Sequence, residues 1–371
     1  MKKYLSCLFL LILLSVWIGE SSGISVSFNP NPQVTPLNQN FTNILKVDNP
    51  VVLHGYSLSI NYDSTKLNFV SASYGSLFSG QNIFWWRVIT DTLNVIVIDC
   101  ILTGQAHVDG PGNLLNLIFN PISGNFTQLS VRWIRLYDMS GGYFWDIERS
   151  PGDIIIGNQA IYAKIKCWLE GPYSNGLMQT NLTNILPLTS PYSADPITVD
   201  AIPADVVDWV LLELRSSATG QTIRSKSMWL TKDGYLQSPG ISIVALLNAP
   251  PGAYYVVIRH RNHLAIMSAN AFQFATTGTA PLLDLTNSAN IYGTMSGVIT
   301  VSPNNIAMIA GDADQNGAIG PSDRNTAWRN QVGLSGYLSA DFNLDGSVFP
   351  SDLNRFWRVN SGRASMVPIS Q

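Results

Sequence analysis

Two acidic stretches near the carboxyl end of the chain carry the residue types that bind hard cations. The first runs from Asp312 to Asp323 and the second from Asp341 to Asp352, at a constant offset of 29 residues. In both copies, oxygen-bearing side chains stand at positions 1, 3 and 5, glycine at position 6 and aspartate at position 12. This spacing is typical of a calcium-binding loop of the EF-hand type. Polar surface turns use the same residue types, but they have no reason to recur in register, so the repeat favours two calcium sites.

Each loop would offer Ca²⁺ several side-chain oxygens and one backbone carbonyl from position 7. Ca²⁺ accepts six to eight oxygen ligands in an irregular shell, whereas Mg²⁺ requires a strict octahedron, so two Ca²⁺ ions are the predicted cofactors. The predicted ligands are Asp312, Asp314, Asn316, Ala318 and Asp323 in the first loop and Asp341, Asn343, Asp345, Ser347 and Asp352 in the second. Position 8 is apolar in both copies, and we expect Ile319 and Val348 to share a small core between paired loops.

The repeat continues beyond the acidic positions into two short segments that we expect to be helical, Arg324–Asn330 and Leu353–Val359. Trp328 and Trp357 stand at equivalent places in them. These helices would serve either as a surface for a partner or as the anchor of the unit onto the preceding module. Tryptophans at equivalent places are more often buried than exposed, so we expect the anchor.

A duplicated loop with a single helix and aspartate at position 12 resembles a dockerin of type I, over about residues 310–363. The resemblance implies a small EF-hand-like calcium module that binds a cohesin. Gly320 and Phe349 occupy position 9, where dockerins carry a polar residue, and Pro-Ser occupies positions 10 and 11, where dockerins contact their partner. The resemblance therefore implies calcium binding more directly than it implies the identity of a partner.

The amino end has the organisation of a secretory signal peptide over residues 1–23. Two lysines precede the apolar run Leu5–Ile18, and small residues follow it. The apolar run is short and terminal, and no other stretch competes as a membrane span. We therefore expect a protein that is secreted or held at the cell surface, with no membrane span after cleavage. Cys100 and Cys167 would then be two buried thiols in different domains.

Residues 24–157 have the pattern of a β-sandwich. Polar and apolar residues alternate in Tyr56–Tyr62, and turn residues recur between several such runs. The segments Gly55–Val70, Gly112–Phe119 and Gly152–Gly157 resemble strands of cohesins, in that order. The resemblance implies a jelly roll in which one sheet face receives a dockerin.

A second strand-rich region occupies residues 158–303. Its strands include Val207–Leu214 and Tyr254–Ile258, and it resembles a poorly characterised module of secreted bacterial proteins. No linker rich in Pro, Ser and Thr separates it from the calcium module predicted at 304–365, so we expect the two to pack together. A tail follows at 366–371. The predicted fold class is mainly β: two β-sandwich modules of jelly-roll or Ig-like type, followed by a small helical calcium module.

Other constellations in the chain are less specific. His260 and His263 have a metal-like spacing, but no Cys or Glu cluster accompanies them, so we favour hydrogen-bonding roles over zinc. Adjacent strand residues point to opposite faces, so only one of Trp85 and Trp86 can be free to stack on a sugar. No acid pair within a motif and no nucleophile elbow predicts catalysis. The net charge of −3, without a Lys/Arg cluster, argues against nucleic acid.

These patterns predict a secreted, non-catalytic scaffold or adaptor protein. Its assembly would depend on calcium and would join it to proteins that carry dockerins or cohesins, or to further copies of itself head to tail. Its setting would be the handling of extracellular polysaccharide. The alternative is a carbohydrate-binding protein or adhesin, in which the first sandwich holds a glycan and calcium only stabilises the carboxyl end.

Overall fold

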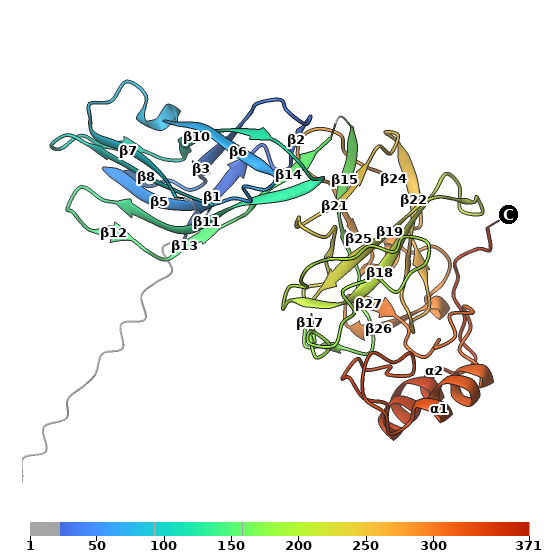
Figure 1. The fold of residues 1–371 in the computed structure, drawn as a ribbon. Helices are drawn as coiled ribbons and strands as arrows, with labels where there is room; N and C mark the ends of the chain where they lie inside the picture. Colours follow the sequence, from blue (N-terminus) through green and yellow to red (C-terminus); the bar gives the residue numbers. More distant parts are fainter. Residues whose placement is uncertain (1–22, 92–93, 158, 371) are drawn as a thin grey trace, which may run out of the picture.

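The computed structural model describes residues 23–91, 94–157 and 159–370. The predicted signal peptide, residues 1–23, therefore lies outside the described part of the chain except for Gly23. The fold is mainly β, as expected: two strand-rich bodies lie side by side, and a helical unit lies against the second (Figure 1). Within the described residues, no helix combines the length and the hydropathy needed to cross a bilayer.

The first body is a sandwich of two sheets. The smaller sheet has the order β13 (Ile147–Arg149), β1 (Ile24–Asn29), β3 (Phe41–Val47), β10 (Gly112–Pro121) and β6 (Leu67–Tyr74). The larger sheet has the order β2 (Gln33–Thr35), β14 (Gly152–Ile156), β11 (Phe126–Tyr137), β5 (Gly55–Asn61), β8 (Val95–Leu102) and β7 (Ile83–Asp91), with β12 (Tyr143–Phe144) paired to β11. Side chains alternate between the two faces of a strand, so Tyr56, Leu58 and Ile60 of β5 are fully buried between the sheets.

The second body is built around β18 (Val206–Arg215), in which every residue is buried. Its main sheet has the order β20 (Leu236–Gln237), β19 (Thr222–Thr231), β18, β22 (Ala253–Arg259) and β23 (Ile266–Met267), with β24 (Phe272–Gln273) also paired to β22. A second sheet contains β21 (Val244–Leu247), β15 (Ala160–Lys166) and β25 (Leu282–Asp284), and the remaining pairs are β16 (Tyr173–Ser174) with β17 (Leu177–Met178) and β26 (Val298–Ser302) with β27 (Asn305–Met308). One apolar core joins these elements and includes both Ile161 and Trp209.

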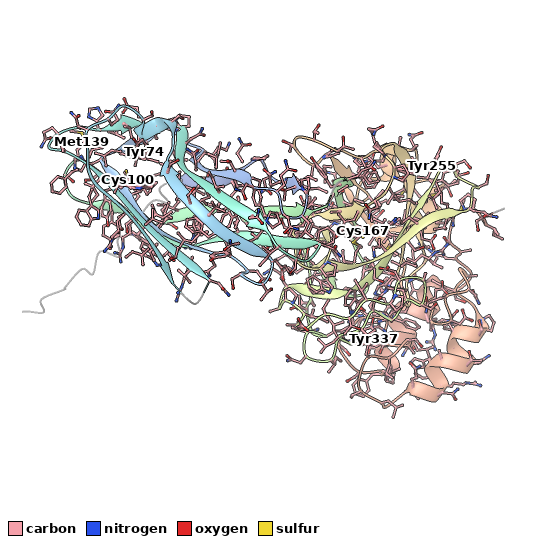
Figure 2. The ribbon with its side chains drawn as sticks, turned by 45° about the horizontal axis from the view of Figure 1, so that its top comes forward. Tyr74, Cys100, Met139, Cys167, Tyr255 and Tyr337 are labelled. Atoms are coloured by element: carbon pink, nitrogen blue, oxygen red, sulfur yellow. The ribbon has the colours of Figure 1, made fainter. Side chains whose placement is uncertain are left out.

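Both described cysteines are free and buried, in different bodies (Figure 2). This confirms the prediction of two separate thiols. Burial raises the pKa of Cys100 and of Cys167 to about 12. Neither side chain is therefore a reactive thiolate near neutral pH.

The first and second bodies are joined by an apolar cluster and a buried carboxylate. In the cluster, Ile155 of β14 packs with Tyr162 of β15 and with Ile243. Asp153 of β14 accepts a hydrogen bond from the hydroxyl of Ser242 at 2.6 Å and another from its backbone N–H at 3.1 Å. These contacts fix how the two bodies sit against each other.

The helical unit contains one short helix for each acidic loop. The helices are η4 (Asp323–Trp328, of π type) continued by α1 (Arg329–Gln331), and η5 (Asp352–Trp357, of π type) continued by α2 (Arg358–Asn360). Asn360 donates a hydrogen bond to Glu170 of the second body at 2.8 Å. Ile319 packs in one apolar cluster with Leu264 and Ile309. The unit thus packs on the second body, as the absence of a linker predicted.

The last described residues also lie against the second body. Arg215 of β18, which is almost fully buried, donates from Nη1 to the carbonyl of Pro368 at 2.8 Å. Met366 fills the space beside Gly293 and Gly297, where an added Cβ would lie 2.7 and 2.6 Å from its atoms. The segment predicted as a tail is therefore packed at least to Pro368.

Candidate functional site

Three carboxylates converge in the first acidic loop. Oxygens of Asp312, Asp314 and Asp323 lie within 4.8 Å of one another, close enough to share a cation. Asp312 accepts hydrogen bonds from the backbone N–H groups of Asn316 and Gly317 at 3.0 and 3.1 Å, and Asp323 accepts one from Asp314 at 3.2 Å. Gly317 has a φ of 85°, which glycine adopts without steric cost. The backbone of the loop therefore donates hydrogen bonds to the loop's own carboxylates.

The second loop repeats this hydrogen-bond pattern at the same offset. Asp341 accepts hydrogen bonds from the backbone N–H groups of Asp345 and Gly346 at 3.1 and 2.9 Å, and Asp352 accepts one from Asn343 at 3.3 Å. Position 3 is an amide in this loop, and in the described part of the chain only the first loop forms a three-carboxylate cluster. The two loops share their backbone hydrogen-bond pattern and each has three carboxylates, but the first loop has its amide at position 5 and the second at position 3.

The other predicted ligands lie in the same two loops. Asn316 donates to Asp314 at 2.9 Å, and Asn343 donates to Asp345 at 2.7 Å. The residues at position 7 would contribute backbone carbonyls. The structure brings the first-loop carboxylates together, while the assignment of all ten residues as ligands stays a prediction.

Burial dominates the electrostatics of the loops. The pKa of Asp312 and the pKa of Asp341 are raised to about 7, chiefly by burial, with a further rise from neighbouring aspartates. Burial also raises the pKa of Asp323 and of Asp352, and backbone N–H donors oppose the rise. A divalent cation would offset the cost of burying these like charges. An all-oxygen donor set of this kind fits a hard cation.

The sequence suggested that the residues at position 8 share a small core between the two loops, and this prediction is wrong. Ile319 packs against Leu264 of the second body, whereas Val348 lies in a separate cluster with Phe342. Each loop pairs instead with the segment that follows the other copy's helix. For the first loop, this pairing is the bridge between Ala318 and Ala364. The matching bridge in the second loop joins Ser347 to Ser335, which follows the first copy's helix.

Each of the two repeat tryptophans also contacts the loop of the other copy. Trp328 donates from Nε1 to the carbonyl of Phe349 at 3.2 Å, and Trp357 donates to the carbonyl of Gly320 at 2.8 Å. Both acceptors occupy position 9 of the other copy's loop. The expected anchor onto the second body is seen only in part, because both indoles bond within the helical unit, while Trp357 also packs against the cluster that contains Leu264.

One residue of the second body contacts both loops at their first position. The carbonyl of Asn262 accepts hydrogen bonds from the N–H groups of Gly311 and Asp312 at 2.9 and 3.2 Å. Its Nδ2 donates to the carbonyl of Asp341 at 2.7 Å, and the residue is fully buried. Asn262 therefore ties both loops to the second body. The sequence analysis missed it because no local pattern marks it.

His260 and His263 belong to a buried polar network beside these loops. Their Nδ1 atoms lie 3.0 Å apart, and Nε2 of His260 lies 3.2 Å from Asp208. Arg261 and Tyr337 (labelled in Figure 2) donate to the same carboxylate at 2.9 and 2.6 Å. Burial raises the pKa of Asp208, but Arg261 and the hydrogen-bond donors outweigh it and lower the pKa to about 2. Burial lowers the pKa of both histidines. This geometry agrees with hydrogen-bonding roles for the pair.

A second candidate surface is the outer face of the larger sheet in the first body. We call it the aromatic face, and it contains Trp85, Trp133, Arg135, Tyr137 and Tyr143. The guanidinium of Arg135 lies 5.7 Å from the ring centroid of Trp133 and 5.3 Å from that of Tyr143. Trp85 and Tyr143 are each 49% exposed. The sheet therefore holds large rings at the surface in a fixed arrangement.

The adjacent tryptophans of β7 divide as the strand pattern predicts. Trp85 lies on the aromatic face, whereas Trp86 packs against the core of the sandwich. The ring centroid of Trp86 lies 5.7 Å from that of Tyr74. A register shift between Ile83 and Trp85 leaves Phe84 exposed as well. The sequence did not predict this second exposed ring.

No protein-family model matches the chain, and no curated protein matches it.

Solved structures that are similar to part of the chain include cohesin modules. A non-cellulosomal cohesin from Archaeoglobus fulgidus is 15% identical, with a TM-score of 0.31, over 36% of this chain and 91% of that structure. The sixth cohesin of scaffoldin B from Acetivibrio cellulolyticus, solved with a dockerin, is 13% identical, with a TM-score of 0.31, over 36% and 99%. A type II cohesin domain from that organism is 13% identical, with a TM-score of 0.33, over 36% and 97%. Similarity at this level carries no argument about function.

Proposed function

We propose that the protein is a non-catalytic adaptor whose first body binds a protein partner through the aromatic face. The observation that carries this proposal is that Arg135 lies over the half-buried ring of Trp133 and the exposed ring of Tyr143 on the outer face of a sheet. Trp, Tyr and Arg supply most of the binding energy at protein interfaces, because they bury large areas and lose little conformational freedom. Side chains held by a sheet are also ordered before the partner arrives.

Two Ca²⁺ ions stabilise the carboxyl end in this proposal, one in each acidic loop. The ligands would be the ten residues named in the sequence analysis. The buried carboxylates with raised pKa support a cation at each loop. Ca²⁺ would supply the positive charge that these acids lack, and Asn262 would transmit the order of both loops to the second body. Extracellular modules commonly bind Ca²⁺ with dissociation constants of ~10⁻⁴–10⁻³ M, so external calcium would keep the loops occupied.

The partner in this proposal is a dockerin-bearing protein or a second copy of the chain, joined head to tail. The protein would be exported and would act in the handling of extracellular polysaccharide. Its domains would be 24–157, 158–303 and 304–365. The sequence resemblances to cohesins and dockerins support these finer assignments.

The proposal is tested by binding measurements on the full secreted chain in Ca²⁺. Surface plasmon resonance against a panel of isolated dockerin modules, with sedimentation velocity for self-association, should reveal one partner. Trp133→Ala combined with Tyr143→Ala should weaken that binding at least about tenfold, because it removes rings at the centre of the face. Ile223→Ala, on the exposed side of β19 in the second body, is the matched control and should bind normally.

Two results would contradict the proposal. Equal binding by the double variant and the control would place the interface elsewhere. A chain that stays monomeric and binds no dockerin would remove the adaptor function itself.

A further inference from the structure

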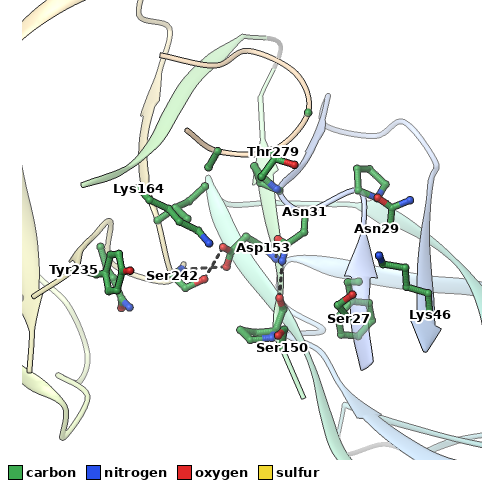
Figure 3. A pocket seen from close by; sticks show the side chains of 18 of the residues that line it. Ser27, Asn29, Asn31, Lys46, Ser150, Asp153, Lys164, Tyr235, Ser242 and Thr279 are labelled. Carbon is green, nitrogen blue, oxygen red and sulfur yellow. Dashed lines mark hydrogen bonds between the residues drawn. The ribbon is translucent and has the colours of Figure 1, made fainter. Parts of the chain in front are cut away.

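A cleft of about 600 Å³ lies between the first and second bodies (Figure 3). One wall comes from β1, the turn after it and the start of β14, and the other comes from β15, β20 and the segment before β25. Sites for small molecules typically measure ~300–1,000 Å³ and often form between domains. The cleft therefore has the size and the position of a ligand site.

Polar side chains line this cleft from both bodies. Several of them have no hydrogen-bond or ion-pair partner among residues 23–91, 94–157 and 159–370. They are Asn29 and Ser150 from the first body and Tyr235, Gln237 and Thr279 from the second. Lys164 interacts electrostatically with Asp153. Amide, hydroxyl, phenol and ammonium groups thus face one space from two sides. A ligand with many hydroxyl groups could bond to both walls at once, because each hydroxyl both donates and accepts.

The floor of the cleft is ordered without a ligand. Asp153 accepts hydrogen bonds from Ser242, which joins the two bodies. Asn31 donates to the carbonyl of Pro151 at 2.8 Å and accepts from the N–H of Asp153 at 2.9 Å. Both walls are therefore fixed relative to each other, and a ligand would bind without the cost of closing the cleft.

The charges that line the cleft are balanced. Lys46 lies 3.0 Å from Asp48, and Lys164 faces the buried carboxylate of Asp153. In Figure 3, Lys46 and Lys164 lie on opposite sides of the cleft with Asp153 between them. Asp233, hydrogen-bonded to Thr231, adds a second acid. The two lysines of the lining are matched by its two acids, and Asp48 lies outside the lining, so no net positive charge selects an anionic ligand.

We propose that this cleft binds a neutral oligosaccharide. Its size, its unpartnered hydroxyl and amide groups and its balanced charge together define that ligand class. The inference does not depend on the aromatic face or on calcium. It places a glycan site between the two bodies, whereas the sequence-based alternative placed one in the first sandwich.

The test uses the full secreted chain on an array with three classes of glycan: neutral, uronate-containing and sulfated. A neutral oligosaccharide that binds is then titrated by isothermal calorimetry. Thr279→Trp places a large ring at the exposed edge of the cleft, and Lys164→Ala removes the ammonium group that lines it near Asp153. Thr276→Trp, exposed on the same loop but outside the cleft lining, is the matched control.

We expect the neutral glycan to bind the wild type and Thr276→Trp equally. Binding should fall at least about tenfold in Thr279→Trp and measurably in Lys164→Ala. Equal binding by Thr279→Trp would place the glycan elsewhere and overturn the proposal. Binding of only the acidic glycans, or of none at millimolar concentration, would overturn it too. The double variant of the aromatic face should keep glycan binding, so this proposal and the adaptor proposal can fail separately.

Discussion

Asn262 connects two loops that the sequence presents as independent copies. Its backbone carbonyl bonds to the start of the first loop, and its side chain bonds to the carbonyl of Asp341 in the second. The convergence of Asp312, Asp314 and Asp323 could be predicted, because these residues lie at fixed spacings within one short loop. Asn262 could not, because its partners come from segments far along the chain. The same holds for Tyr337 and Asp208, which meet only in the folded protein.

We expect Asn262→Ala to lower the free energy of unfolding by about 1–3 kcal/mol, because the buried carbonyl of Asp341 loses its donor. Urea denaturation in saturating Ca²⁺, followed by circular dichroism, measures this change. The variant should also need more Ca²⁺ for half-saturation. Asn325→Ala, on the exposed side of η4, is the control. A change for Asn262→Ala within about 0.5 kcal/mol of that control would count against the tie.

At the scale of elements, the duplicated loops and helices form where the repeat predicts them. The loops, however, pair with other segments than the sequence suggested. A repeat of 29 residues is compatible with each loop pairing with its own helix segment, with the other copy's segment or with the other loop. The structure has the second of these arrangements, in which Ala318 pairs with Ala364. Apolar residues at position 8 need a core, but their pattern does not say which one. Ile319 packs against the second body, and Val348 packs within the helical unit.

Removal of Ca²⁺ should destabilise the helical unit. A ligand that binds only the folded state stabilises it by about 2.7 kcal/mol at a hundred times its dissociation constant. EDTA should therefore lower the Tm of the full chain, and excess Ca²⁺ should restore it, as measured by differential scanning calorimetry. Asp323→Asn with Asp352→Asn should reduce this response, because each removes a buried carboxylate from one loop. Asp109→Asn, exposed in the first body, should respond like the wild type. A Tm that EDTA leaves unchanged would contradict calcium binding.

At the scale of the whole molecule, strand patterns predicted two β-rich bodies and their order. They did not predict the junction, because Asp153 and Ser242 stand in strands and turns that look ordinary on their own. The cleft beside the junction was missed for the same reason. Its lining joins β1 to β15 and β20, and each of these strands contributes only one or a few residues. Alternating polarity shows which face of a strand is buried, but not which separate bodies will meet.

The junction gives a prediction about cooperativity. Ser242→Ala removes the hydroxyl that bonds to the buried carboxylate of Asp153, so we expect a loss of about 1–3 kcal/mol. The substitution should weaken the contact between the bodies. Calorimetry should therefore show two unfolding transitions that lie further apart in temperature than those of the wild type. Ser216→Ala, exposed at the end of β18, is the control. Transitions in Ser242→Ala that are no further apart than in the wild type would show that the apolar cluster alone couples the bodies.

The exchange of contacts between the two copies, with Trp328 reaching Phe349 and Trp357 reaching Gly320, means that neither half is complete by itself. A shortened protein with a single copy would have one tryptophan side chain and one loop carbonyl without their hydrogen-bond partners. Such a product could recover those contacts only by associating with another molecule of its own kind. We therefore expect the two copies to fold only as a pair.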